Sequence, residues 1–132
     1  MSQYHYEVEI PVRYRDLDPL GHVNNAVYAT YLEQARTSYI DDVIGAPPEE
    51  LGLVVANLEL DFDRSITFRE QVTVGLRTTH IGTSSVSMDY EVRTDDGVAA
   101  TANSVIVTLD EEGSPCPVTD DVRQRIVDYE GL

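Results

Sequence analysis

The sequence contains no lysine, no tryptophan, one cysteine and no long apolar run. A single cysteine excludes a disulfide within the chain, and Cys116, set between two prolines with no His or Asp cluster around it, is predicted to be structural. No window of about 18 apolar residues is present, so we expect no membrane-spanning helix. The first residues, MSQYHYEVEI, lack a basic start and an apolar stretch, so we expect no signal peptide. These absences together predict a cytoplasmic protein that does not insert into membranes.

The missing lysines leave nine arginines against 24 acidic residues, a formal net charge of -15. Repulsion at this charge density destabilises a small compact domain in dilute buffer. At about 1 M salt the Debye length falls to roughly 3 Å, so the repulsion is largely screened. We interpret the composition as halophilic, an adaptation to a very salty cytoplasm, with an ordinary acidic protein as the alternative. General nucleic-acid binding is not expected, because it requires a basic face.

Apolar residues recur at helical spacing after the first 25 residues, and this pattern predicts one long helix over residues 25–44. Asn24 or Asn25 can cap its start through a side-chain oxygen. Gly45 can end it, because glycine readily adopts the left-handed conformation that follows many helices. A shorter helix is expected over residues 119–129.

The remaining chain is typical of strands, and 132 residues fit a single domain, placed at residues 1–132. The expected strands are residues 4–14, 51–62, 71–81, 84–94 and 99–110. Gly82 and Thr83 predict a tight hairpin between the third and fourth strands, and Thr119 is a candidate cap for the terminal helix. A strand, a long helix and then four antiparallel strands indicate an α+β fold, with a curved antiparallel sheet wrapped around the central helix.

The stretch DLDPLGHVNN, residues 16–25, leads into the predicted helix. A helix start carries unpaired N–H groups and a partial positive charge, which can hold a developing oxyanion. A nearby carboxylate such as Asp18 is ionised at neutral pH, and it can attack a carbonyl or take a proton from water. Because a thiolate leaves without strong acid help, this arrangement suits thioester hydrolysis better than peptide hydrolysis. The alternative is that Asp16 and Asp18 only form the turn before Pro19 and Gly21.

Residues 12–36, VRYRDLDPLGHVNNAVYATYLEQAR, closely resemble the opening of the hot-dog-fold acyl-CoA thioesterases of the 4-hydroxybenzoyl-CoA thioesterase family. The similarity lies in the D-x-D-x-x-G-H-V-x-N core, an aromatic residue at Tyr28 and YLEQAR on the helix. GTSS, residues 82–85, resembles the turn between the third and fourth strands of that family. The resemblance implies a hot-dog fold, hydrolysis of an acyl-CoA to a free acid and CoA, no cofactor, and a homodimer or a tetramer built as a dimer of dimers.

The same resemblance implies roles for individual residues. Asp18 corresponds to the reacting carboxylate, as nucleophile or general base, and Asp16 to a structural residue. Asn25 would orient substrate or water, and His22 is either a catalytic partner or a hydrogen-bonding residue of the loop. Backbone amides between Val23 and Ala26 would polarise the thioester carbonyl. The implied substrate-binding residues are Tyr14, Val23, Asn24, Tyr28, Thr83 and Ser84.

Other charged side chains have weaker claims to the site. Glu33 lies on the predicted helix, where some hot-dog thioesterases place their carboxylate, but we expect it to pair with Arg36 or with a neighbouring subunit. No His, Cys and Asp cluster has metal-ligand spacing, so no metal is expected. The phosphates of CoA need cationic partners. The candidates by location are Arg64, Arg69, Arg77 and Arg93, each equally explained as a surface charge.

Two further functions stay open at this point. One is an enoyl-CoA hydratase-like enzyme of the same fold, because Asp18 and His22 offer an Asp–His pair; the N-P-x-H context of that group is missing, since Asp18 stands before Pro19. The other is a non-catalytic acyl-CoA-binding protein. Pocket shape sets the acyl group, and the sequence does not give that shape.

Overall fold

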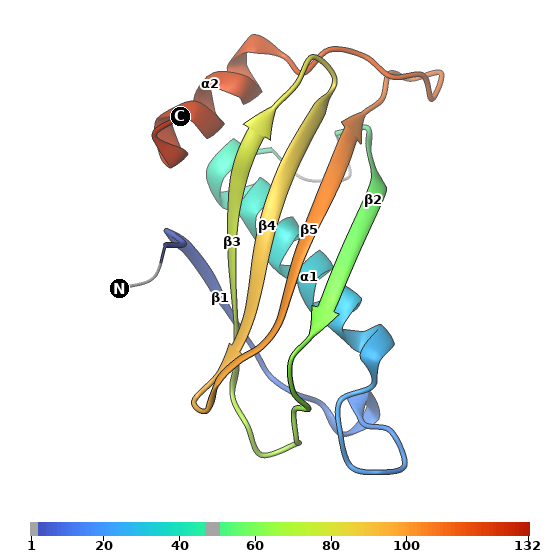
Figure 1. The fold of residues 1–132 in the computed structure, drawn as a ribbon. Coiled ribbons are helices and arrows are strands. Elements are labelled where there is room, and N and C mark those ends of the chain that lie inside the picture. Colours follow the sequence, from blue (N-terminus) through green and yellow to red (C-terminus); the bar gives the residue numbers. More distant parts are fainter. Residues whose placement is uncertain (1–2, 47–50) are drawn as a thin grey trace.

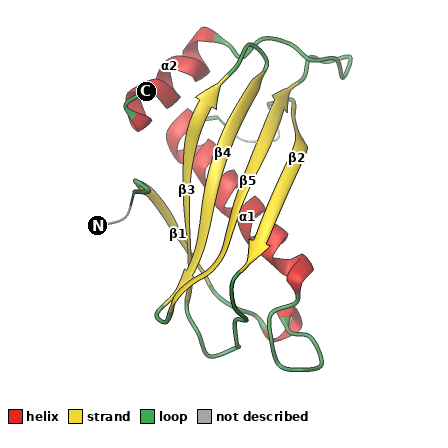
Figure 2. Ribbon diagram, viewed as in Figure 1, coloured by secondary structure: helices red, strands yellow, loops and turns green. Residues whose placement is uncertain are grey.

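The computed structural model describes residues 3–46 and 51–132, and within them five strands form one antiparallel sheet (Figure 1). The strands are β1 (Tyr6–Ile10), β2 (Leu53–Phe62), β3 (Val72–Ile81), β4 (Ser85–Thr94) and β5 (Gly97–Thr108). Their order in the sheet is β1-β3-β4-β5-β2, so β2 crosses over to the edge opposite β1. The predicted α+β class is confirmed, with helices and strands arranged as in Figure 2.

Helix α1 (Asn25–Tyr39) lies across one face of the sheet, and α2 (Asp120–Glu130) lies near one end of it (Figure 1). Asn24 caps α1, because its Oδ1 accepts from the Ala26 amide at 2.9 Å. The turn after α1, Ile40–Ile44, is π-helical and ends at Gly45, whose φ of 79° is left-handed. The predicted helix over residues 25–44 is therefore confirmed, with a wider last turn. No helix in the described residues is long and apolar enough to cross a membrane.

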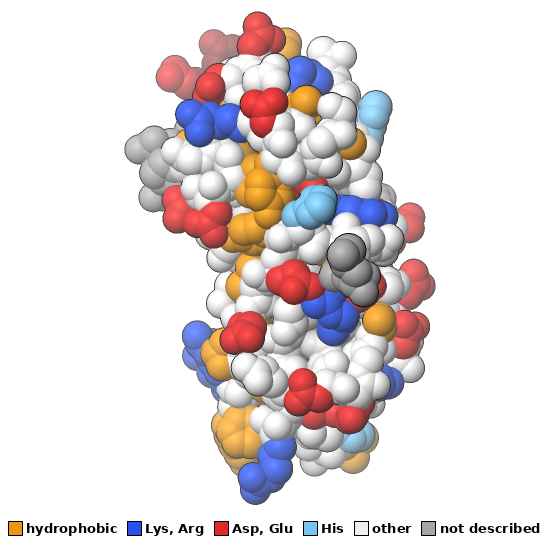
Figure 3. Space-filling view, turned by 90° about the vertical axis from the view of Figure 1, so that its left-hand side faces the viewer, with side chains coloured by type: hydrophobic (Ala, Val, Ile, Leu, Met, Phe, Trp, Pro, Cys, Tyr) orange, Lys and Arg blue, Asp and Glu red, His pale blue; other side chains and the backbone are white. Residues whose placement is uncertain are grey.

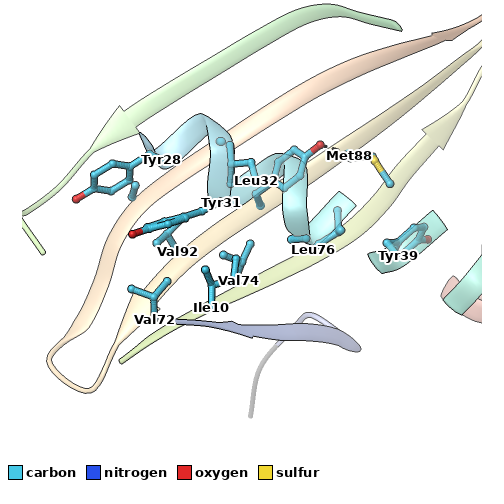
Figure 4. Packing of buried hydrophobic residues seen from close by; sticks show 14 of the residues in the cluster. Ile10, Tyr28, Tyr31, Leu32, Tyr39, Val72, Val74, Leu76, Met88 and Val92 are labelled. Carbon is cyan, nitrogen blue, oxygen red and sulfur yellow. Dashed lines mark hydrogen bonds between the residues drawn. The ribbon is translucent and has the colours of Figure 1, made fainter. Parts of the chain in front are cut away.

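The core forms between one face of α1 and the inward face of the sheet (Figure 4). β4 buries every second residue, which is the period expected of a strand with one covered face. Fully burying one large apolar side chain contributes about 1.5–3 kcal/mol, so this interface is the main source of stability. Buried members of this core from α1 include Tyr28, Tyr31, Leu32 and Tyr39, and those from the strands include Ile10, Val72, Val74, Leu76, Met88, Tyr90 and Val92.

Several predicted element boundaries differ from the observed ones by one or two residues, and the end of the first strand differs most. The first strand was expected over residues 4–14, but β1 ends at Ile10, because Pro11 has no N–H to continue the ladder. The chain then forms a 3-10 turn at Tyr14–Asp16. The connection between β3 and β4 includes Ser84 as well as the predicted Gly82 and Thr83, with the Gly82 amide donating to the Ser85 carbonyl at 2.8 Å. The cap at Thr119 is confirmed, since its side chain accepts from the Val122 amide.

Strand β2 is an exposed edge of the sheet (Figure 1). Most of its ten residues are solvent-exposed, including the large apolar side chains Val54, Val55, Leu58 and Phe62, at 39–45 %. A long apolar edge strand is a template for pairing with another chain. Elsewhere the surface is strongly charged: on the face drawn in Figure 3, acidic side chains are scattered from end to end with arginines among them.

Candidate active site

The loop between Asp16 and the start of α1 is closed by its own backbone. The Asp18 amide donates to the His22 carbonyl at 2.7 Å, and the Gly21 amide donates to the Asp18 carbonyl at 3.0 Å. Gly21 has a φ of 81°, a left-handed conformation that glycine adopts without strain. The Val23 amide donates to the Ile66 carbonyl at 2.8 Å, which ties the loop to the segment after β2. The loop therefore holds its side chains in a fixed frame.

The two carboxylate oxygens of Asp18 have different surroundings. Oδ1 accepts from the Leu20 amide at 2.8 Å and from the His22 amide at 3.1 Å. Oδ2 has no hydrogen-bond partner recorded among residues 3–46 and 51–132. Because two amides fix one oxygen, the other is presented in a set direction. That oxygen is the one available for attack or for taking a proton.

The amides at the start of α1 are mostly occupied. The Val23 amide donates to Ile66, the Asn24 amide donates to the Asp16 carbonyl at 2.9 Å, and the Ala26 amide donates to the side chain of Asn24. Of the four amides from Val23 to Ala26, only that of Asn25 has no acceptor within the described part of the chain. The predicted oxyanion donor therefore narrows from four amides to one.

These groups line one pocket of about 260 Å³. Its walls come from two segments far apart in the sequence, the start of α1 with its preceding loop and the residues that follow β2, which meet at one end of the molecule (Figure 1). The lining residues are Asp18, His22, Val23, Asn25 and Tyr28 on one side and Phe62, Asp63, Arg64 and Ser65 on the other.

Tyr28 forms the apolar floor of this pocket. It is only 1 % exposed, its ring packs edge-on against Phe62 with centroids 5.0 Å apart, and its hydroxyl donates to the Arg64 carbonyl at 3.3 Å. Burial raises the pKa of the Tyr28 hydroxyl, with the nearby Arg64 acting in the opposite direction. Tyr28 therefore stays neutral at physiological pH and serves as a hydrogen-bond donor and packing surface.

Asp16 lies beside the pocket, and one of its carboxylate oxygens is held by the protein. Its Oδ2 accepts from the Arg13 amide at 2.8 Å and from the Tyr31 hydroxyl at 2.8 Å. Burial, and then the hydrogen bond to Asp16, raise the pKa of Tyr31. Of the two aspartates of the D-x-D motif, Asp16 connects the loop to α1 and Asp18 faces the pocket.

Several residues predicted for the site lie outside this pocket. Tyr14 is 81 % exposed and packs edge-on against Phe68, with ring centroids 6.3 Å apart. Asn24 serves as the cap of α1. Thr83 and Ser84 lie at the far end of the sheet, where their carbonyls accept from the Val118 and Thr108 amides.

The separation of Thr83 and Ser84 from Asp18 follows from strand register. In β2, Leu53 pairs with Thr108 and Phe62 pairs with Ala100, so Phe62 and Ser84 lie at opposite ends of β5. At about 3.4 Å per residue, the eight residues of β5 between the two ends span roughly 27 Å. One chain therefore does not bring these turn residues to the Asp18 pocket.

The other charged candidates are placed as follows. Within the described residues no ion pair joins Glu33 and Arg36, and Arg36 donates to the Tyr90 hydroxyl at 3.2 Å. The alternative partner of Glu33, a neighbouring subunit, stays a prediction. Arg77 pairs with Asp89 at 3.4 Å, and Arg93 pairs with Glu7 and Glu91. Arg69 is exposed. Among residues 3–46 and 51–132, no group of three or more His, Cys, Asp or Glu is arranged to hold a metal.

Sequence reasoning missed the wall formed by residues 62–65, apart from Arg64 as a candidate phosphate ligand. A signal was present, because three polar residues, DRS, directly follow the apolar strand of β2. These residues come to the start of α1 because β2 crosses over to the edge of the sheet, and that crossover cannot be predicted from local sequence patterns.

Residues 12–126 match the thioesterase-like superfamily. The chain belongs to this superfamily. A crystal structure of a thioesterase complexed with coenzyme A and Zn, from Thermus thermophilus, is 40 % identical and superposes with a TM-score of 0.91, covering 100 % of this chain and 98 % of that one. The predicted hot-dog fold is confirmed by this match and by the observed sheet and helix.

Two further thioesterases are similar to this chain. The chloroplastic acyl-acyl carrier protein thioesterase ATL3 of Arabidopsis thaliana is 26 % identical over 136 residues, which cover 98 % of this chain and 70 % of that protein. DHNA-CoA thioesterase from Staphylococcus aureus is 22 % identical with a TM-score of 0.84, covering 96 % of this chain and 95 % of that one, and this likeness concerns the fold alone. Membership of the superfamily supports hydrolysis of acyl thioesters in general.

Proposed function

We propose that this protein is an acyl-CoA thioesterase of the 4-hydroxybenzoyl-CoA thioesterase family, in which Asp18 is the nucleophile or general base. The observation that carries the proposal is the pairing of two groups in one pocket. Oδ2 of Asp18 has no recorded protein partner, and the Asn25 amide at the start of α1 has none either, within the described residues. A fixed carboxylate oxygen and a free helix-start donor are the two groups that thioester hydrolysis needs.

The reaction begins with the thioester carbonyl oxygen accepting from the Asn25 amide, where the partial positive charge of the helix start favours developing negative charge. In the nucleophilic route, Oδ2 of Asp18 attacks the carbonyl carbon, the C–S bond breaks, and CoA leaves as thiolate. Water then hydrolyses the mixed anhydride and restores the carboxylate. In the general-base route, Oδ2 takes a proton from the water that attacks the same carbon, the C–S bond breaks, and the proton passes to the leaving thiolate. Both routes give a carboxylic acid and a thiol.

The other lining residues have supporting roles in this mechanism. The amides of Leu20 and His22 hold Oδ1 and so aim Oδ2 at the carbonyl. The side chains of His22 and Asn25 line the same pocket, where they can orient the attacking water. Val23 and Tyr28 contribute the apolar wall against which the acyl group packs. Tyr14, Asn24, Thr83 and Ser84 keep a role in this proposal only as contacts to the more distant parts of a bound substrate.

A CoA thioester is the preferred substrate because the 40 % identical Thermus thioesterase was solved with coenzyme A. The ATL3 relative makes a thioester of acyl carrier protein the second candidate. We also propose a homodimer in which the exposed edges of β2 pair, with a dimer of dimers as the alternative. Burial of Val54, Val55 and Leu58 would drive this pairing. One domain over residues 1–132 and a cytoplasmic location stay predictions.

A thiol-release assay tests the proposed activity. Purified protein is incubated in molar KCl with saturated, aromatic and 2-enoyl CoA thioesters, and free thiol and enoyl absorbance are followed in parallel. Thiol release from at least one CoA thioester is expected. Loss of enoyl absorbance without thiol would instead identify the hydratase-like enzyme, and binding without either reaction would identify a non-catalytic acyl-CoA-binding protein. Light scattering in the same buffer tests assembly; a fully active monomer would contradict the dimer.

A further inference from the structure

Arg64 is the pocket residue whose hydrogen bonds the protein does not complete. Its Nε and Nη2 are buried and have no hydrogen-bond partner among residues 3–46 and 51–132. The carboxylate of Asp96 lies 4.0 Å from Nη2, which is too far for a hydrogen bond. Buried donors without an acceptor are rare in native proteins because leaving them unpaired costs free energy. These two donors therefore call for an acceptor that the chain itself does not supply.

The third nitrogen of Arg64 is firmly held. Nη1 donates to the Ser65 carbonyl at 3.0 Å and to Oε1 of Glu70 at 3.2 Å. The other oxygen of Glu70 accepts from the Thr67 amide at 3.1 Å, so this carboxylate ties the guanidinium to the backbone after β2. The Tyr28 hydroxyl fixes the Arg64 carbonyl from the side of α1. The guanidinium is thus positioned before any ligand arrives, which lowers the cost of binding one.

We infer that Arg64 is a further substrate-binding residue, whose Nε–H and Nη2–H donate to a carbonyl oxygen of the thioester held at Asp18. The inference rests on the proposed function. Arg64 lines the same pocket as Asp18, Asn25 and Tyr28, so a substrate placed for attack by Asp18 lies beside Arg64. A charged donor binds a carbonyl oxygen more strongly than a neutral donor does.

The charges around Arg64 favour a neutral oxygen over a phosphate. Asp18 and Asp63 line the same pocket, and Glu70 already neutralises Nη1. A phosphate dianion would meet these carboxylates at short range, whereas a carbonyl would not. The carbonyl has two possible sources: the thioester carbonyl that every substrate carries, or a second carbonyl on the acyl group. In the first case Arg64 assists the Asn25 amide, and in the second it selects oxygenated acyl groups.

Arg64→Lys tests the inference, because lysine keeps a cation opposite Glu70 and lacks the two buried donors. Thiol release is measured for a saturated and a 3-oxo acyl group of equal length, each as CoA and as N-acetylcysteamine thioester. We expect kcat/KM to fall about 10- to 100-fold, the size typical of losing hydrogen bonds from a charged donor. An equal fall in kcat for both acyl groups would show that Arg64 donates to the thioester carbonyl. A fall confined to the 3-oxo group, mainly through KM, would show that Arg64 donates to the second carbonyl.

Arg125→Lys is the matched control. Arg125 is exposed on α2, its Nε donates to Asp121 at 3.2 Å, and it does not line the Asp18 pocket. Its kcat/KM should match wild type. Unchanged kinetics in Arg64→Lys, or a loss seen with CoA and absent with N-acetylcysteamine thioesters, would overturn the inference. If Arg64→Lys does not fold, Arg64→Gln is judged by the same outcomes. An inactive wild type refutes the proposed function itself.

Discussion

The two ends of α1 differ in whether their polar groups have hydrogen-bond partners within the protein. At the start, Oδ2 of Asp18 and the amide of Asn25 have no recorded partner in the described residues, and the adjoining pocket is lined by charged and polar side chains. At the far end, the Tyr39 hydroxyl bonds both Thr78 and Glu130, at 3.0 Å and 2.7 Å. Glu130 also accepts from the Thr78 amide at 2.8 Å.

This difference distinguishes the far end of α1, which anchors the helix to the sheet, from the start of α1, where the proposed reacting groups lie. The far end also contains a cavity of about 170 Å³, but apolar side chains from the turn after α1, β5 and α2 dominate its lining. Such a cavity offers little to a reacting carbonyl. A satisfied end fixes the helix on the sheet, and that fixed helix can then present unpaired donors at its other end. Of the polar groups named at the two ends of α1, those without a partner in the described residues therefore lie beside Asp18, at the proposed site.

Asp18→Asn should produce the largest effect, and it acts at the start of α1. The substitution keeps the shape and removes the negative charge, so neither attack nor proton removal can proceed. We expect kcat to fall at least about 10²-fold, the loss typical of a missing general base, while acyl-CoA binding largely survives. Steady-state thiol release and equilibrium binding measure the two quantities.

The control for Asp18→Asn is Asn25→Ala, which removes a side chain that orients the reaction and keeps the backbone donor. It should lower kcat less than Asp18→Asn does. If Asp18→Asn retains near wild-type turnover on a good substrate, the assignment of Asp18 is wrong, and Glu33 and then His22 become the next residues to test.

Glu130→Ala, at the far end of α1, should lower stability and leave activity nearly unchanged. It removes the acceptor of the Tyr39 hydroxyl and of the Thr78 amide, and Thr78 is only 2 % exposed. An unpaired buried amide costs about 1–3 kcal/mol, so the free energy of unfolding should drop by about that amount. Urea unfolding measures the drop, and kcat of the folded protein at low temperature should stay close to wild type. A large loss of kcat without loss of stability would contradict the division between the two ends.

The anchoring end was easier to predict from sequence than the reacting end. The apolar spacing after Asn25 and the glycine at Gly45 depend on local rules, so the helix and its limits were predicted correctly. Asp18 was singled out by the family resemblance of the D-x-D motif, since local rules alone left it open as a turn residue, and the structure places it in the pocket wall. The partner wall at residues 62–65 depends on where β2 lies in the sheet, and that is a long-range property. Local patterns likewise carry no information on which of four adjacent amides is left without an acceptor.

Salt should reduce unfavourable charge interactions at the far end of α1 more than at its start. Asp41 and Asp42 follow the last turn of α1, where the partial negative charge of the helix end disfavours acidic side chains. With a net charge of -15, the melting temperature should rise steeply from dilute buffer to molar KCl. Differential scanning calorimetry across that range measures the rise.

Asp41→Asn is the local test of this salt effect, since Asp41 is exposed. It should stabilise the protein by about 0.3–1 kcal/mol in dilute buffer, and the gain should disappear in molar KCl. A flat response of the wild-type melting temperature to KCl would refute the halophilic interpretation and leave the proposed activity untouched.

Tyr31→Phe tests whether every polar contact near Asp18 is catalytic. The variant loses the hydrogen bond to Asp16, so the free energy of unfolding at pH 7 should fall by about 1 kcal/mol, with kcat largely retained.

Burial and Asp16 raise the pKa of Tyr31 in the folded state above its ordinary value of 10.0. The unfolded chain therefore ionises first, and the contribution of Tyr31, fully present below pH 10, declines as the pH rises above 10. The stability gap between wild type and Tyr31→Phe should accordingly narrow as the pH rises above 10 in urea titrations. A gap that widens with pH would contradict the raised pKa of Tyr31. A loss of kcat as large as that of Asp18→Asn would show that Asp16 and Tyr31 take part in the reaction together with Asp18.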